Sequence, residues 1–132
     1  MILTISKERL FKPEFNGNRK EAETDQVVVH YRTPTIAIKN RLTPRNDTKA
    51  ITTKDGLIDH LEINLELNDN DMLKEMLINI DNLSYKDDSG VEVKIRNVTE
   101  LNNAPLEFDS LRKEIITEFR KALNEADINE KN

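Results

Sequence analysis

The clearest pattern in the chain is the alternation of apolar and polar side chains between Leu57 and Leu67. A period of two residues places every second side chain on the same face of an extended strand. The apolar face carries Leu57, Leu61, Ile63, Leu65 and Leu67, and the polar face carries His60, Glu62, Asn64 and Glu66. This alternation predicts a half-buried β-strand over residues 57–67.

The spacing of the apolar residues changes after Asn68. The next apolar side chains recur at intervals that share one face of an α-helix: Met72, Leu73, Met76, Leu77 and Ile80. Asn70 is a suitable N-cap, and an aspartate in the first turn favours the positive end of the helix dipole. We therefore expect a helix over residues 71–80.

Further strands are expected on both sides of this helix. Gln26–Arg32 is rich in β-branched and aromatic residues, and Val91–Ile95 alternates after the turn-forming residues Lys86–Gly90. The apolar residues Met1–Ile5 are compatible with one more strand. Phe11–Asp25 contains a proline, a glycine and many charges, so we expect an irregular arm there.

Two shorter segments carry helix-start signals. Thr33 and Pro34 suit the N-cap and the first position of a helix. The residues that follow, TIAIKNRL, also alternate as in a strand, so both structures remain open there. Asn97 and Glu100 have the spacing of a capping box for a short helix, which Pro105 ends.

The C-terminal part predicts a longer helix with one apolar stripe. The stripe consists of Leu111, Ile115, Ile116, Phe119, Ala122, Leu123 and Ala126. We expect the last residues, 129–132, to fray. The pattern as a whole predicts a single α+β domain over residues 1–132, with several short antiparallel strands followed by a helical C-terminal part. Residues 1–25 would form a partly irregular arm and residues 128–132 a frayed tail.

Composition limits the classes of protein that fit. Apolar residues make up 36% of the chain and charged residues 34%, so we expect a modest core and a well-solvated surface. No apolar run is long enough to cross a membrane, and we expect no secretory signal in the first residues. The chain has no cysteine, which excludes disulfides and thiolate chemistry and fits a reducing cytosol.

The charge balance argues against a nucleic-acid partner. The 20 lysines and arginines are outnumbered by 25 acidic residues, which gives a net charge of -5. The densest basic stretch, residues 41–49, also contains Asp47, whereas phosphate binding needs clustered cations. The excess of negative charge is also too small to imitate DNA, so it serves solubility.

No motif for catalysis or for a cofactor stands out. His30 and His60 lie on the polar sides of predicted strands, without a second ligand at metal-binding spacing. The run Asp87–Gly90 lacks the flanking carboxylates of a calcium loop and reads as a hairpin turn. The three glycines are too far apart to cradle a phosphate. We therefore expect no catalytic residue, metal or cofactor.

Two stretches of the chain resemble a known family. The first is FKPEFNGNRKEAETDQVVVHYRTPT, from Phe11 to Thr35, and the second is IDNLSYKDDSGVEVKIRNVTELNNAPLEFDSLRKEI, from Ile80 to Ile115. Both are similar to segments of bacteriophage and prophage tail assembly chaperones. The shared features are an aromatic-x-Pro-x-aromatic segment with Gly-Asn-Arg, a Gln-led strand, an acidic turn with Gly, and a terminal amphipathic helix.

The resemblance implies a non-enzymatic, protein-binding function in the host cytoplasm. Proteins of this family coat the tape measure protein, keep it soluble and help the tail tube protein to assemble around it. Association of the chain with itself, as a homo-oligomer, is a further expectation. Two other classes stay open: a phage structural subunit, such as a tail completion or connector protein, and a small α+β protein-binding module unrelated to phage.

A protein-binding function needs an apolar surface, and the sequence offers two candidates. The first is the pair Met72 and Met76, whose flexible thioethers adapt to irregular partners. The second is the helical stripe that includes Leu111, Ile115, Phe119 and Leu123. The alternative for both is an ordinary stripe that faces the core, because surface helices normally carry one.

Overall fold

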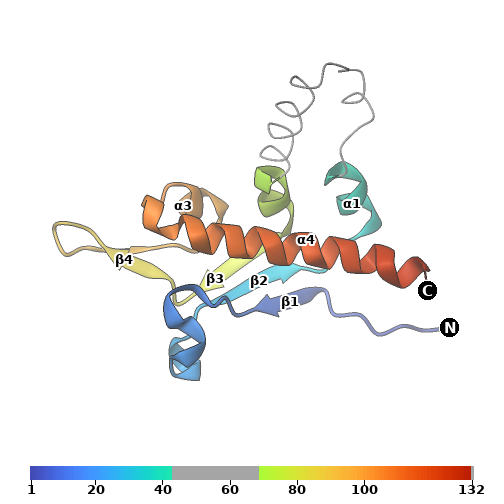
Figure 1. The fold of residues 1–132 in the computed structure, drawn as a ribbon, viewed down its shortest axis with the longest axis horizontal. Helices are drawn as coiled ribbons and strands as arrows, with labels where there is room; N and C mark the ends of the chain where they lie inside the picture. Colours follow the sequence, from blue (N-terminus) through green and yellow to red (C-terminus); the bar gives the residue numbers. More distant parts are fainter. Residues whose placement is uncertain (43–68, 132) are drawn as a thin grey trace, which may run out of the picture.

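The computed structural model describes residues 1–42 and 69–131, with side chains as far as Asn124. The predicted strand over residues 57–67 lies outside these residues. The described part combines antiparallel strands with helices, which confirms the α+β class (Figure 1).

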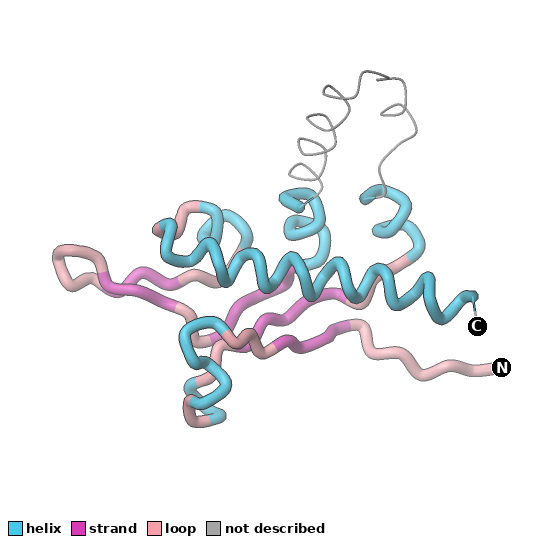
Figure 2. The backbone as a smooth tube through the Cα atoms, viewed as in Figure 1, coloured by secondary structure: helices cyan, strands magenta, loops and turns pink. Residues whose placement is uncertain are grey.

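A three-stranded antiparallel sheet forms the centre of the fold. Its strands are β1 (Glu8–Phe11), β2 (Val28–Arg32) and β3 (Leu77–Asp81), in the order β1-β2-β3. A separate hairpin, β4 (Ser84–Lys86) with β5 (Glu92–Lys94), follows β3 and projects from the sheet (Figure 2). The strand predicted at residues 26–32 and the one predicted at residues 91–95 are thus both confirmed, with shorter bounds.

The helices are α1 (Ile36–Leu42), residues 69–76, α3 (Val98–Asn102) and α4 (Asp109–Lys131). Helix α4 runs across one face of the sheet (Figure 1), and the rings of Tyr31 and Phe119 meet there with centroids 4.8 Å apart. Val29 and Ile80 are buried in the same core. The backbone of α4 is helical as far as Lys131, so this helix includes most of the residues that we expected to fray.

The predicted helix over residues 71–80 is only half right. The chain is helical over residues 69–76 and passes directly into β3 at Leu77. Asn70 lies within the helical residues and is therefore not an N-cap. The pairing of β2 with β3 contains a bulge, in which Tyr31 faces Leu77 and His30 faces Asn79, so that Ile78 is the extra residue.

This bulge explains the wrong prediction. It leaves Leu77 and Ile80 buried on the same side of the strand although they are three residues apart. A spacing of three is typical of a helix face, whereas a regular strand would bury every second residue. The bulge therefore gives the strand a helical spacing.

The first residues are not a strand either. Residues 1–6 have no regular structure, and the large side chains of Met1, Ile2 and Leu3 are exposed. The Ser6 hydroxyl donates to the Glu8 carbonyl at 2.7 Å and accepts from the Glu8 amide at 3.4 Å. Both backbone groups of Glu8 are thereby satisfied locally, which blunts the outer edge of β1 at its start.

Between β1 and β2 the arm is more ordered than predicted. It contains two short 3-10 helices, Phe15–Lys20 and Glu23–Asp25, with left-handed backbone at Asn16 and Gly17. The buried Asn18 side chain donates to the carbonyls of Pro13 and Val27 and accepts from the Val27 amide at 2.6 Å. This side chain ties the arm to the start of β2.

The open choice after Thr33 is settled in favour of a helix. The cap is Thr35 rather than Thr33, because the Thr35 hydroxyl accepts from the Ile38 amide at 3.1 Å and its carbonyl accepts from Lys39. Thr33 instead donates its hydroxyl to the Ser6 carbonyl. Pro34 accordingly precedes the helix and is not its first residue.

Capping residues fix the C-terminal elements. The Asn97 side chain accepts from the Glu100 amide at 2.9 Å, as the predicted capping box requires. The Glu100 carboxylate accepts from the Arg96 amide, one residue before the cap.

The turn between β4 and β5 is stabilised by Asp87, whose carboxylate accepts from the amides of Ser89 and Val91. Gly90 supplies the positive φ of 78° that this turn contains.

Candidate functional site

The side chains predicted to bind a partner lie in the core. Met72, Met76, Leu111, Ile115 and Phe119 are all at most 3% exposed. Leu123 packs against the same core and is partly buried. The predicted docking surfaces are therefore wrong for this fold. Both stripes instead belong to one buried core cluster, as the alternative predicted.

Exposed aliphatic side chains gather elsewhere, around a groove beside the sheet. The groove has a volume of about 930 Å³ and is lined by residues 5–8, by residues 32–35 at the end of β2, and by side chains from α1 and β3. We call it the aliphatic groove. Its apolar members are Ile5, Pro34, Ile38 and Ile78.

Local structure explains why these aliphatic side chains are exposed. Ile78 is the extra residue of the bulge, and it is 43% exposed. Ile5 precedes the first strand and is 66% exposed. Ile38 is almost fully buried. Ile36 begins α1 next to the groove residue Thr35 and is 79% exposed.

Charged side chains border the aliphatic groove. Arg41 on α1 and Glu75 on the helical residues 69–76 form a two-pronged ion pair, with Nε–Oε1 and Nη2–Oε2 distances of 3.1 and 2.8 Å. The hydrogen bond to Arg41 holds the pKa of Glu75 below its usual value, and the same contact raises the pKa of Arg41. The pair joins the two helical segments.

The cations of the rim outnumber its unpaired acids. Glu75 is paired with Arg41, and Glu8 contacts His30 at 3.2 Å. Lys7 and Arg32 make no ion pair with any residue that the structure describes, although the charge of Arg32 contributes to the lowered pKa of Glu75. The rim thus carries three cations, Lys7, Arg32 and Arg41, and two acids, Glu8 and Glu75, although the chain as a whole is acidic.

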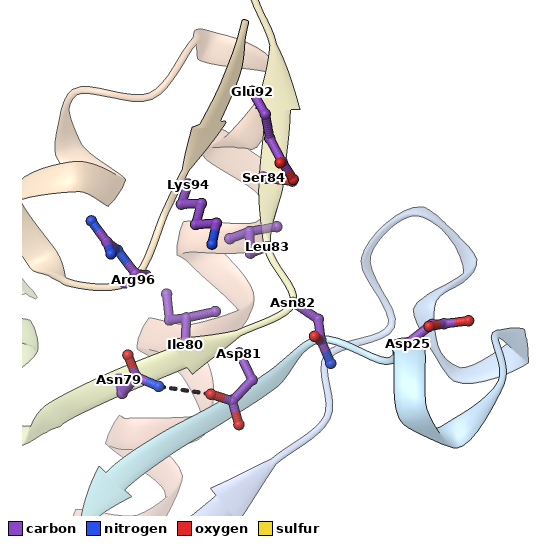
Figure 3. Close-up of a pocket in the computed structure, with 10 residues that line it drawn as sticks. All are labelled: Asp25, Asn79, Ile80, Asp81, Asn82, Leu83, Ser84, Glu92, Lys94 and Arg96. Atoms are coloured by element: carbon purple, nitrogen blue, oxygen red, sulfur yellow. Dashed lines mark hydrogen bonds between the residues drawn. The ribbon is translucent and has the colours of Figure 1, made fainter.

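A second hollow, of about 540 Å³, is polar. It lies between the end of β3 and the projecting hairpin, and Figure 3 shows its lining. Asn79 donates to Asp81, Ser84 donates to Glu92, and Arg96 is paired with Glu100. Two pairs of its polar side chains thus bond to each other, and Arg96 and Asn82 bond to residues outside the hollow.

The open face of the sheet carries one row of charged and polar side chains. His30 on β2 lies between Glu8 on β1 and Asp81 on β3, with its Nε2 2.5 Å from an Asp81 carboxylate oxygen. Because the two carboxylates are already bonded to the imidazole, this row cross-links the three strands. In residues 1–42 and 69–124, no group of three or more histidine or acidic side chains is arranged to hold a metal ion.

The structure also shows where residues of the two resembling stretches lie. Phe15, from the first stretch, and Phe108 and Tyr85, from the second, form an aromatic cluster with centroid distances of 5.8 and 5.6 Å. Asn18 of the Gly-Asn-Arg segment is the buried anchor of the arm. These side chains therefore hold the fold together, whereas the end of the first stretch, Arg32–Thr35, lines the aliphatic groove.

Sequence reasoning missed the aliphatic groove. The apolar start, Met1–Ile5, is compatible with a strand by its pattern, and the helical spacing of residues 71–80 places Ile78 inside a helix. A bulge leaves no reliable mark in a single sequence, so nothing in the sequence indicates that Ile78 is exposed.

None of the helices that the structure describes has the length and apolar character needed to cross a bilayer. Comparisons with protein-family models, curated proteins and solved structures found no match to this chain.

Proposed function

We propose that this chain is a bacteriophage tail assembly chaperone. In this proposal it is a non-enzymatic protein of the host cytoplasm that binds the tape measure protein, keeps it soluble and supports the assembly of the tail tube protein. The resemblance over residues 11–35 and 80–115 supports the family. The observation that carries the binding function is the aliphatic groove, whose exposed isoleucines are surrounded by charged side chains.

An exposed apolar patch with a polar rim is the usual form of a protein-binding surface. A chaperone of a long helical client has to cover apolar side chains of that client until assembly. The aliphatic groove offers exposed Ile5 and Ile78 for this contact, and Ile36 extends the exposed apolar surface along α1. The side chains of Met72 and Met76 and the apolar stripe of α4, by contrast, are already buried in the core of the folded chain.

Co-expression tests the proposal. The chain and the tape measure protein of the same phage would be produced together, and the soluble fraction of the tape measure protein would be measured with and without the chain. We expect the chain to raise that fraction, and the double substitution Ile5→Ser with Ile78→Ser to remove the gain. Leu106→Ser is the matched control, because Leu106 is 85% exposed and does not line the groove.

Two results would contradict the proposal. An unchanged soluble fraction would exclude a chaperone of this client. A stable ring of the chain alone at micromolar concentration, seen by light scattering, would favour a structural subunit of the tail.

A further inference from the structure

We infer that the aliphatic groove selects acidic segments of its partner, in which carboxylates stand beside aliphatic side chains. This inference rests on the proposed function and specifies the chemistry of the client. It is carried by two cations of the rim that make no ion pair in the described residues, Lys7 and Arg32, together with the exposed Ile5 and Ile78 of the same groove.

The charged side chains that line the groove determine whether its occupant should carry negative or positive charge. Glu75 is paired with Arg41, and Glu8 lies 3.2 Å from the His30 imidazole, so both acids of the rim already have contacts within the chain. Lys7 and Arg32 make no ion pair in the described part of the chain, although the charge of Arg32 acts on Glu75, and both side chains are exposed. A carboxylate of the partner can replace that water, whereas a lysine of the partner would face two like charges. Complementary charge adds specificity to the apolar contact.

The geometry also favours a partner over a second copy. The exposed apolar start of this chain, Met1–Ile5, contains no acidic residue. The apolar stripe of α4 is buried against the sheet as far as its side chains are described. The exposed Leu106 does have acidic neighbours, Glu107 and Asp109, and self-association through it is therefore an outcome that the experiment has to separate.

The test uses two synthetic helical peptides with the same leucine and isoleucine positions. One carries glutamate at its polar positions and the other carries lysine. Fluorescence anisotropy of the labelled peptides, titrated with the full chain, gives their dissociation constants. We expect the acidic peptide to bind at least about tenfold more tightly, with a difference that shrinks as salt screens the rim.

Single substitutions locate the binding surface. Lys7→Gln and Arg32→Gln should each weaken the acidic peptide about fivefold and leave the basic peptide unchanged or slightly tighter. Ile78→Ser should weaken both peptides. Lys94→Gln and Leu106→Ser are the matched controls, because they remove the same charge and a similar apolar side chain outside the groove. A thermal melt of each variant shows whether it is folded.

Equal affinity for the two peptides, or an acidic peptide that is insensitive to Lys7 and Arg32, would overturn the inference. Concentration-dependent dimers that Leu106→Ser and Ile78→Ser both abolish would also overturn it, because a second copy would then fill the groove. Acidic selectivity without any effect on the solubility of the tape measure protein would support the groove chemistry and refute the chaperone. Solubilisation of the tape measure protein that depends on Ile78 but not on Lys7 or Arg32 would support the chaperone and refute the selection of acidic segments.

Discussion

Asn18 is the only side chain classed as polar among the buried residues that the structure describes. Its amide and its carbonyl oxygen are both bonded to backbone groups, on Pro13 and Val27. A hydrophobic residue of similar size would leave two carbonyls and one amide without partners in a dry environment. Asn18 therefore contributes directly to the conformation of the arm.

Asn18→Ala should lower the free energy of unfolding by about 2 to 3 kcal/mol, since buried backbone groups lose their hydrogen bonds. Urea denaturation measures this change. Asn103→Ala is the control, because Asn103 is exposed and contributes only backbone groups to the end of α3. A similar decrease in the free energy of unfolding for the two variants would show that the buried hydrogen bonds of Asn18 do not contribute to stability.

Glu100 links stability to pH at the residue scale. Its side-chain hydrogen bond with Arg96 is the main reason that its pKa lies below the usual value in the folded chain. A group with a depressed folded-state pKa stabilises the fold above its unfolded pKa, and this contribution is lost as the pH falls through the folded value.

Glu100→Gln should therefore destabilise the protein at neutral pH, and its difference from the parent chain should shrink below the ordinary glutamate pKa of 4.5. Urea midpoints measured from pH 7 down to about pH 3 follow this convergence. Glu107→Gln is the matched control, because it removes an exposed acid without an ion pair in the described residues. A Glu100→Gln difference that stays the same over the whole pH range would rule out the linkage.

At the scale of elements, α4 and the sheet depend on each other. Phe119 is fully buried and its ring lies against Tyr31 of β2. A sequence can show that such a stripe exists, but only packing shows what covers it. The apolar positions of α4 were predicted correctly, and their function was not, because a helix stripe looks the same whether it faces a core or a partner.

Phe119→Ala should cost about 3 to 5 kcal/mol of stability, since it leaves a cavity at the centre of the core. Any loss of partner binding should follow from unfolding and disappear under conditions that keep the variant folded. Thermal or urea denaturation measures the first effect. Leu106→Ala, at an exposed site, should change stability by less than about 0.5 kcal/mol. An unchanged melt for Phe119→Ala would contradict the packing described above.

The same distinction applies to the strands. Residues 26–32 and 91–95 were recognisable because β-branched residues and a turn with glycine are local signals. The end of the helix at Met76 was not, because the bulge at Ile78 imitates helical spacing. The first apolar residues lacked a partner strand, which no local pattern reveals. Non-local pairing and irregular register therefore account for the main errors.

At the scale of the whole molecule, one aromatic cluster joins regions that are distant in sequence. Phe108 contacts Phe15 of the arm and Tyr85 of the hairpin. Each aromatic pair contributes about 0.5 to 1.5 kcal/mol beyond its burial. The arm, the hairpin and the start of α4 are thus stabilised together.

Phe108→Ala should increase amide hydrogen exchange in both the arm and the β4–β5 hairpin, while the amides of β2 remain protected. Exchange followed by mass spectrometry resolves these segments. Leu106→Ala, two residues away and exposed, should change neither segment. Faster exchange in only one of the two segments would show that the cluster does not couple them.

The direct passage from helix to strand at Met76 and Leu77 has a consequence for how this chain can change length. One residue inserted there would turn the helix by about 100° relative to the strand. It would also exchange the inward and outward faces if β3 slipped to absorb it. We therefore expect related chains to keep a constant length at this junction and to gain or lose residues at the exposed turn around Asp88. For the same reason, an inserted affinity tag belongs in that turn.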